Sequence, residues 1–141
     1  MSAMTPEQRR AFLSHGTRTG KLATTRADGR PHVVPIWFVL DGDDIILTTG
    51  ASSVKARNLR RDPRVSLAVD DQQPPYSFVM LEGTATLAED APDLLDWATR
   101  IGGRYMGADR AEEYGRRNGV PGELLVRITP TKFTAEAGVA D

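Results

Sequence analysis

The sequence contains no cysteine and only two histidines among its 141 residues. Without cysteine, the chain has no disulfides, thiolate nucleophile, iron–sulfur cluster or cysteine-bound zinc. Only His15 and His32 supply side-chain nitrogen ligands, so a metal site would need mostly carboxylates, and we expect none. Neither histidine lies in a nucleophile elbow or beside a recognisable triad partner, which argues against hydrolase chemistry.

Long apolar runs and a strong net charge are also missing. No segment approaches the roughly 18 apolar residues that a membrane span needs, and no basic leader precedes an apolar run. A formal net charge of -1 provides no basic field for nucleic acid or anionic membranes. We therefore expect a soluble, cytoplasmic protein without nucleic-acid or membrane partners, folded as one domain over residues 1–141.

The positive charge that is present gathers in residues 52–63, which are predicted to form a short basic helix between two apolar strands. Ser52 or Ser53 can cap its start, and Asp62 before a proline ends it. Lys55 lies in the first turn, where a cation opposes the helix dipole, so a bound phosphate would relieve the mismatch. The alternative is a solvent-exposed charged helix without a ligand.

Apolar alternation, turn residues and capping signals predict the remaining elements. Strands are expected at residues 20–26, 31–40, 45–49, 64–70, 76–87, 123–129 and 131–136, the last two separated by Pro130. Further helices are expected at residues 5–15, from Pro92 until an interruption at Gly102–Gly103, and at 109–117. Gly83 is expected to mark a bulge. Hairpin-length connections favour a mainly β, α+β fold: a six-stranded antiparallel barrel with flanking helices.

Two further segments are expected to converge on the basic helix. Thr48 and Thr49 end the strand that leads into it, which would bring hydroxyl and main-chain groups beside the helix start. Val33–Phe38 is an apolar strand, expected to run antiparallel to Leu47–Thr49 and to form a wall beneath a planar ring. Pro35 lacks a ladder donor and marks an edge or bulge, where a ligand can reach main chain. Each segment has a plainer alternative as ordinary strand or core.

Residues 20–83 resemble the split β-barrel flavin-binding proteins of the pyridoxamine 5′-phosphate oxidase-like superfamily. Two motifs, ATTRADGRPHVVP at 23–35 and KARNLRRDPRV at 55–65, are similar to the branch that uses the deazaflavin coenzyme F420. The resemblance implies an FMN-binding type of split barrel and a homodimer with cofactors at the subunit interface. It also implies F420-dependent hydride transfer to an unsaturated or quinone-like small molecule, and leaves the catalytic residues unknown.

The resemblance and the charge pattern together assign cofactor contacts by position. The residues are Val34, Pro35, Ile36, Trp37, Thr48, Thr49, Ser53, Lys55, Arg57, Arg61 and Ser77. By the resemblance, Lys55 would hold the cofactor phosphate, helped by Ser53 and Arg57, and Thr48 and Thr49 would line the ribityl chain and ring. Ser77 would reach the cofactor from the partner subunit. Arg57 and Arg61 would meet the anionic polyglutamate tail of F420.

FMN is the alternative cofactor. The FMN-using oxidases of this superfamily usually place an arginine directly before the helix lysine and a basic residue at the end of the second strand. Val54 and Phe38 stand at these places, which favours the deazaflavin. The oxidase's C-terminal substrate motif is also absent from residues 127–133, so oxidation of pyridoxamine phosphate is not expected. An FMN-dependent oxidase or reductase and a non-catalytic F420 carrier remain as alternative functions.

Overall fold

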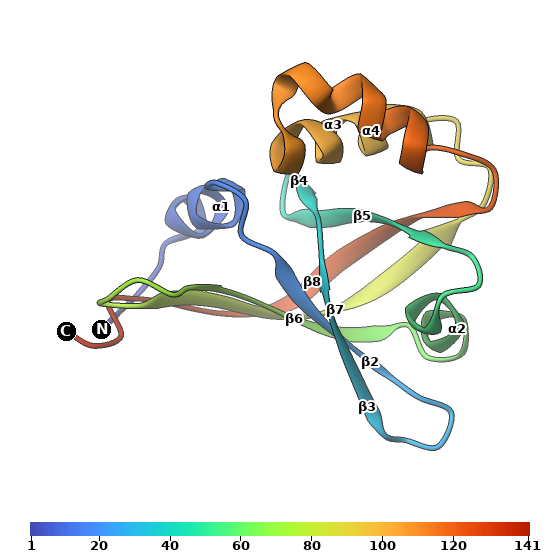
Figure 1. The fold of residues 1–141 in the computed structure, drawn as a ribbon. Coiled ribbons are helices and arrows are strands. Elements are labelled where there is room, and N and C mark those ends of the chain that lie inside the picture. The colour runs from blue at the N-terminus through green and yellow to red at the C-terminus, as the bar shows by residue number, and fades with distance from the viewer.

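A single curved sheet organises the protein in the computed structural model, which describes residues 1–141 (Figure 1). The strands are β1 (Ser2–Ala3), β2 (Gly20–Thr25), β3 (Pro31–Ile36), β4 (Val39–Asp41), β5 (Asp44–Gly50), β6 (Arg64–Asp71), β7 (Ser77–Ala88) and β8 (Glu123–Ala137). The helices are α1 (Pro6–Ser14), α2 (Val54–Arg61), α3 (Leu94–Met106) and α4 (Ala111–Asn118), with a 3-10 turn at Ala108–Arg110. None of the helices is both long and apolar enough to span a membrane.

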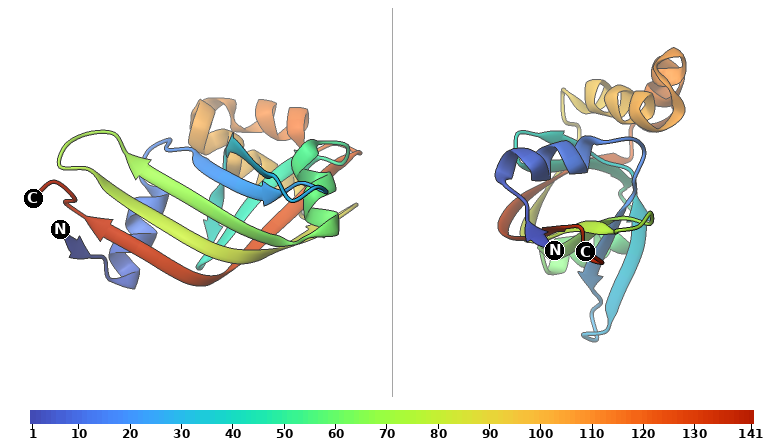
Figure 2. Two further views of the ribbon diagram at one scale, coloured as in Figure 1. Left: turned by 90° about the horizontal axis from the view of Figure 1, so that it is seen from below. Right: turned by 90° about the vertical axis from the view of Figure 1, so that its left-hand side faces the viewer.

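The strands follow the order β3-β2-β6-β7-β8-β5-β4, with β1 paired to β8, and all pairs are antiparallel. β3 leads directly into β4 through Trp37 and Phe38, so the two ends of this order adjoin, and the strands wrap around the core (Figure 2). The predicted mainly β, α+β fold with an antiparallel barrel-like sheet is confirmed. The structure has eight strands instead of six, because β1 is a short added strand and the predicted strand at residues 31–40 is divided into β3 and β4.

The predicted division of the last strand at Pro130 is wrong. β8 continues through this residue, which pairs with Gly83 where the register of β7 and β8 shifts. A side chain at Gly83 would lie 2.6 Å from the carbonyl oxygen of Thr129, so the glycine permits the close approach of the two strands. The predicted bulge is therefore confirmed, and it accommodates a proline that cannot donate to the ladder.

The predicted helix break at Gly102–Gly103 is also wrong, because α3 runs through both residues. A Cβ atom on Gly102 would lie 2.6 Å from the Cβ of Tyr114, and one on Gly103 would lie 3.2 Å from the Cβ of Ala111. The two glycines thus let α4 pack closely on α3. This packing outweighs the roughly 1 kcal/mol that each glycine costs in a helix interior.

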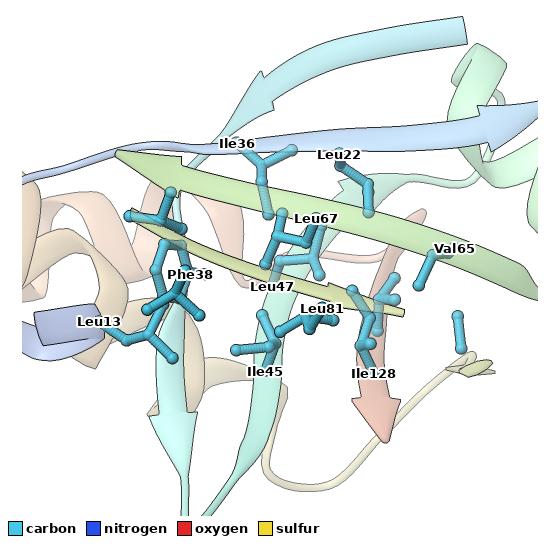
Figure 3. Packing of buried hydrophobic residues seen from close by; sticks show 14 of the residues in the cluster. Leu13, Leu22, Ile36, Phe38, Ile45, Leu47, Val65, Leu67, Leu81 and Ile128 are labelled. Atoms are coloured by element: carbon cyan, nitrogen blue, oxygen red, sulfur yellow. The ribbon is translucent and has the colours of Figure 1, made fainter. Parts of the chain in front are cut away.

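Buried side chains form two clusters on opposite faces of β5. The larger cluster fills the barrel and includes Leu13, Leu22, Ile36, Phe38, Ile45, Leu47, Val65, Leu67, Leu81 and Ile128 (Figure 3). The smaller one joins Ile46 and Leu125 to Leu94 and Trp97 of α3. Successive residues of β5 therefore point alternately into the barrel and toward α3, which also fixes where the threonines at its end point.

Candidate functional site

The end of β5 and the start of α2 form one hydrogen-bonded unit. Ser53 is the N-cap of α2, and its Oγ accepts a hydrogen bond from the main-chain N–H of Ala56 at 3.1 Å. The Thr49 hydroxyl lies 2.9 Å from the same Oγ atom. The predicted cap is confirmed, with Ser53 in the role. The first turn carries no acidic residue, so the positive end of the helix dipole has no carboxylate of its own helix.

Lys55 lies half-buried in this first turn, and a carboxylate from β8 stands near it. Burial lowers the pKa of Lys55, and the charge of Glu123 acts in the opposite direction. Burial raises the pKa of Glu123, while Lys55 and a hydrogen bond from Thr48 lower it. No direct ion pair joins the two charged groups. We call Thr48, Lys55 and Glu123 the Lys55 cluster.

Glu123 was missed by sequence reasoning because it comes from a distant strand. It lies opposite Gly50 in the pairing of β5 with β8, and its Oε2 is 3.9 Å from the Cβ position of that glycine. The main-chain N–H of Ala51 donates to the carbonyl of Gly122 at 2.9 Å, which ties the start of β8 to the loop before α2. Nothing in the local sequence around Glu123 indicates this neighbourhood.

Thr48 and Thr49 point to opposite faces of β5. Thr49 is only 4% exposed and contacts Ser53 inside the barrel, whereas Thr48 joins Glu123 on the outer face. The structure therefore separates two hydroxyls that were expected to line the same ligand. The period of two in a strand already predicts that neighbouring threonines point to opposite faces.

A basic groove of about 330 Å³ lies between α2 and the β2–β3 hairpin. Its lining residues are Arg26, Ala27, Asp28, Arg30, Val54, Arg57, Asn58 and Arg61. Arg61 donates to main chain of β2 and to Asn58, so it chiefly fastens α2 to the sheet. Arg30 is paired with Asp28 at 2.8 Å. Arg57 is exposed and has no hydrogen bond or ion pair from its side chain, which leaves it free for an anionic ligand.

The predicted ring-supporting segment begins in β3, which pairs only with β2 and is an edge strand. The expectation that Pro35 marks an edge is confirmed. Val34 is half-buried, Pro35 is exposed, and Ile36 points into the core, so Ile36 can offer a ligand only its main chain. The expected pairing of this segment with Leu47–Thr49 is wrong, because β5 pairs with β4 and β8.

The predicted strand at residues 31–40 is broken at Trp37 and Phe38, and α3 holds the break in place. The Trp37 ring stacks on Tyr105, with centroids 5.1 Å apart and planes 3° apart, and it lies 6.1 Å from the tilted ring of Tyr114. The Phe38 N–H donates to the Tyr105 hydroxyl at 3.2 Å. These contacts orient the Trp37 ring at the end of the edge strand.

Arg104 of α3 also stabilises the connection between β3 and β4, where the predicted strand is broken. Its guanidinium donates to three main-chain carbonyls, those of Phe38 at 2.7 Å, Leu13 at 2.7 Å and Gly16 at 3.0 Å. Burial lowers the pKa of Arg104, and the charge lies over the Phe38 ring at 4.6 Å. One side chain thereby joins α1, α3 and the β3–β4 connection, a role that the sequence did not indicate.

Ser77 is the first residue of β7, and the end of the sheet next to the chain termini lies opposite the end that carries α2 (Figure 1). Its Oγ accepts a hydrogen bond from the main-chain N–H of Gly138 at 3.1 Å, next to the C-terminus. Within one chain it does not approach Lys55 or Trp37. A contact between Ser77 and the same cofactor requires a second subunit.

Comparisons with known proteins agree with this fold. The sequence matches the family described as pyridoxamine 5′-phosphate oxidase over residues 5–136. It is 38% identical over 98 residues to the F420H(2)-dependent biliverdin reductase of Mycobacterium tuberculosis, covering 67% of this chain and 68% of that one. It is 32% identical over 134 residues to the 5a,11a-dehydrotetracycline/5a,11a-dehydrooxytetracycline reductase of Streptomyces rimosus, covering 84% and 87% of the two chains.

Two solved structures are similar over most of the chain. A conserved hypothetical protein of Mycobacterium tuberculosis superposes with a TM-score of 0.83 at 34% identity, covering 94% of this chain and 84% of that one. A protein described as an F420 reductase superposes with a TM-score of 0.68 at 27% identity, covering 87% and 94% of the two chains.

Proposed function

We propose that this chain, which belongs to the pyridoxamine 5′-phosphate oxidase family, is a reductase dependent on coenzyme F420. The observation that carries the proposal is its similarity to two reductases above 30% identity, one of them named as F420H(2)-dependent. The substrate would be an unsaturated or quinone-like small molecule, in keeping with the conjugated compounds in the names of those relatives. The relatives and neighbours support a flavin or deazaflavin cofactor, and F420 is the one we propose.

The residues at the start of α2 fit a phosphate-bearing cofactor. Ser53 caps the helix and leaves first-turn N–H groups free, and Lys55 has no acidic partner within its own helix. An anion at this position would accept hydrogen bonds from these groups. Arg57 in the basic groove is placed to meet an anionic tail. Arg61 is less available, because one nitrogen of its guanidinium is bound to the carbonyl of Thr25 and to Asn58.

The ring of the cofactor would lie along β3, supported by Val34, Pro35, the main chain of Ile36, and Trp37. When bound, reduced F420 supplies the hydride, and the protein supplies binding, orientation and exclusion of water. The edge position of β3 leaves its main chain open on one side, and the stacked Tyr105 holds the Trp37 ring in one orientation. No side chain of the site is assigned as the proton donor.

We further propose a cytoplasmic homodimer in which Ser77 of each subunit completes the site of the other. Two observations support a second copy. Ser77 starts β7 and is bound to Gly138 near the C-terminus, whereas α2 lies at the other end of the sheet (Figure 2). Large apolar side chains are exposed on the sheet, with Val33 66% and Met80 48% exposed, and such side chains gather where subunits meet.

Fluorescence titration of the purified protein with F420 and with FMN tests the cofactor. We expect F420 to bind more tightly. Lys55→Ala should weaken binding by about 1.5–3 kcal/mol, as expected for a lost hydrogen bond to a charged group. Lys132→Ala, which removes an exposed lysine of β8, is the matched control and should leave the affinity unchanged. Tight FMN binding without any response to F420 would refute the proposal.

Turnover is tested separately. Enzymatically reduced F420 is mixed with the protein and a panel of quinones, enones and tetrapyrroles, and oxidation of the cofactor is followed by absorbance. We expect at least one class to be reduced. Binding of F420 without oxidation by any member of the panel would instead indicate a cofactor carrier.

A further inference from the structure

The carboxylate of the Lys55 cluster has no part in the function proposed above. Glu123 lies near the N-terminal end of α2, opposite Gly50 in the sheet, with Oε2 3.9 Å from the Cβ position of that glycine. The charge of Glu123 acts on Lys55, although the two side chains do not form a direct ion pair. An anion bound by Lys55 would therefore lie near a negative charge that the protein itself supplies.

Other charged groups near this end of α2 do not cancel that effect. Arg60 donates to the carbonyl of Ala51 at 2.7 Å and is paired with Glu89 at 3.4 Å. Thr48, the remaining member of the cluster, is neutral. Lys55 and Glu123 together have a formal charge near zero, and the helix N-terminus adds a partial positive charge of roughly +0.5. Arg57, an unpaired cation of α2, faces the basic groove toward the β2–β3 hairpin.

Such a site distinguishes anions by their charge. The phosphate of FMN is a monoester with a charge of about -1.5 to -2 at pH 7, whereas the phosphate of F420 is a diester and carries one negative charge. The second charge of a monoester would face Glu123 without a second cation, since Val54 occupies the position before Lys55. In general, two unit charges roughly 6 Å apart at an effective dielectric constant of roughly 40 interact by about 1.4 kcal/mol, which changes an affinity by about tenfold per unit of charge.

We propose that Glu123 is a specificity-determining residue that selects a phosphodiester cofactor over a phosphomonoester one. This proposal rests on the proposed function, because it requires the cofactor phosphate at Lys55. It adds a residue from β8 that repels the competing cofactor, and specificity often depends on such repulsion as well as on attraction.

The test compares Glu123→Gln with the unmodified protein, using ligands that differ in phosphate charge. The ligands are riboflavin and 8-hydroxy-5-deazariboflavin, which lack phosphate, F420 with its diester, and FMN with its monoester. Dissociation constants come from fluorescence titration. We expect the variant to bind FMN about three- to tenfold more tightly relative to F420, because the two phosphates differ by about 0.5–1 unit of charge, with both phosphate-free ligands unchanged. Equal changes for FMN and F420, or an equal change for riboflavin, would overturn the proposal.

Two controls separate the possible failures. Glu89→Gln removes a carboxylate that is already paired with Arg60 and should leave the ratio of FMN to F420 affinity unchanged. If Glu123→Gln does not fold, Glu123→Asp, which withdraws the carboxylate by one methylene, should shift the ratio in the same direction by a smaller factor. F420 binding by the unmodified protein with an unchanged ratio in the variants contradicts this inference alone, whereas no F420 binding contradicts the proposed function as well.

Discussion

Replacing Arg104 by methionine should destabilise the protein strongly, although the residue lies in a helix far along the chain from the segments it contacts. The change removes a charged donor from three main-chain carbonyls, at 2.7, 2.7 and 3.0 Å. A hydrogen bond to a charged group contributes about 1.5–3 kcal/mol, and the carbonyls left behind are partly buried. Because water can replace some of these contacts, we expect a loss of about 3–5 kcal/mol in the free energy of unfolding.

Urea denaturation followed by circular dichroism measures this loss, provided that the dependence on urea concentration is unchanged. A chain of this size should show a fall of about 10–15 °C in Tm. Arg104→Lys keeps the charge but cannot reach all three carbonyls, so it should lose an intermediate amount.

Arg100→Met in the same helix is the matched control. Arg100 forms an ion pair with Asp96 at 3.3 Å, and its side chain is 58% exposed, so its removal should cost less than about 1 kcal/mol. Equal losses for Arg100→Met and Arg104→Met would refute the conclusion that the contacts of Arg104 to the main chain hold the β3–β4 connection.

Three further changes test other parts of the structure. Gly115→Ala should destabilise the protein by about 1–3 kcal/mol in urea denaturation, because its Cβ would lie 3.1 Å from the Cα of Thr99 in α3; an increase in stability, as expected for an open helix position, would contradict this packing. Tyr105→Phe should cost about 1–3 kcal/mol through two lost main-chain hydrogen bonds yet preserve the fluorescence of Trp37, whereas Tyr105→Ala should alter that fluorescence; identical spectra for both would argue against the stack. Burial raises the pKa of Glu123 in the folded state above the usual 4.5. The contribution of this residue to stability is therefore present at pH 4.5 and below and is lost as the pH rises through the folded-state pKa. Glu123→Gln should remove this part of the pH dependence of Tm, and an unchanged pH profile in the variant would contradict it.

Much of the fold follows from local sequence. Apolar alternation predicts most strands, since a half-buried strand must separate apolar from polar side chains. The helix ends are equally local: Thr5 and Gln8 form a capping box, and Ser53 caps α2. Pro35 on an edge strand follows from its missing N–H. The position of Lys55 at the start of the basic helix needed no tertiary information.

The errors in the predicted elements all arise from contacts distant in sequence. Trp37 and Phe38 continue an apolar strand by pattern, but Arg104 and Tyr105 bind their main chain and ring and so break the strand. Gly102 lies inside a helix because α4 packs against it. Local propensity amounts to about 1 kcal/mol for such residues, and tertiary packing exceeds it.

The properties of the basic helix therefore come partly from local sequence and partly from the fold. Local sequence is enough to predict a capped helix with Lys55 in its first turn, because capping and helix periodicity depend on neighbouring residues. The groups that surround that lysine depend on the fold, because the pairing of β5 with β8 brings Glu123 to the same end of the helix. Strand register joins residues without regard to their distance in sequence, so the charge balance of an anion site is a property of the folded chain.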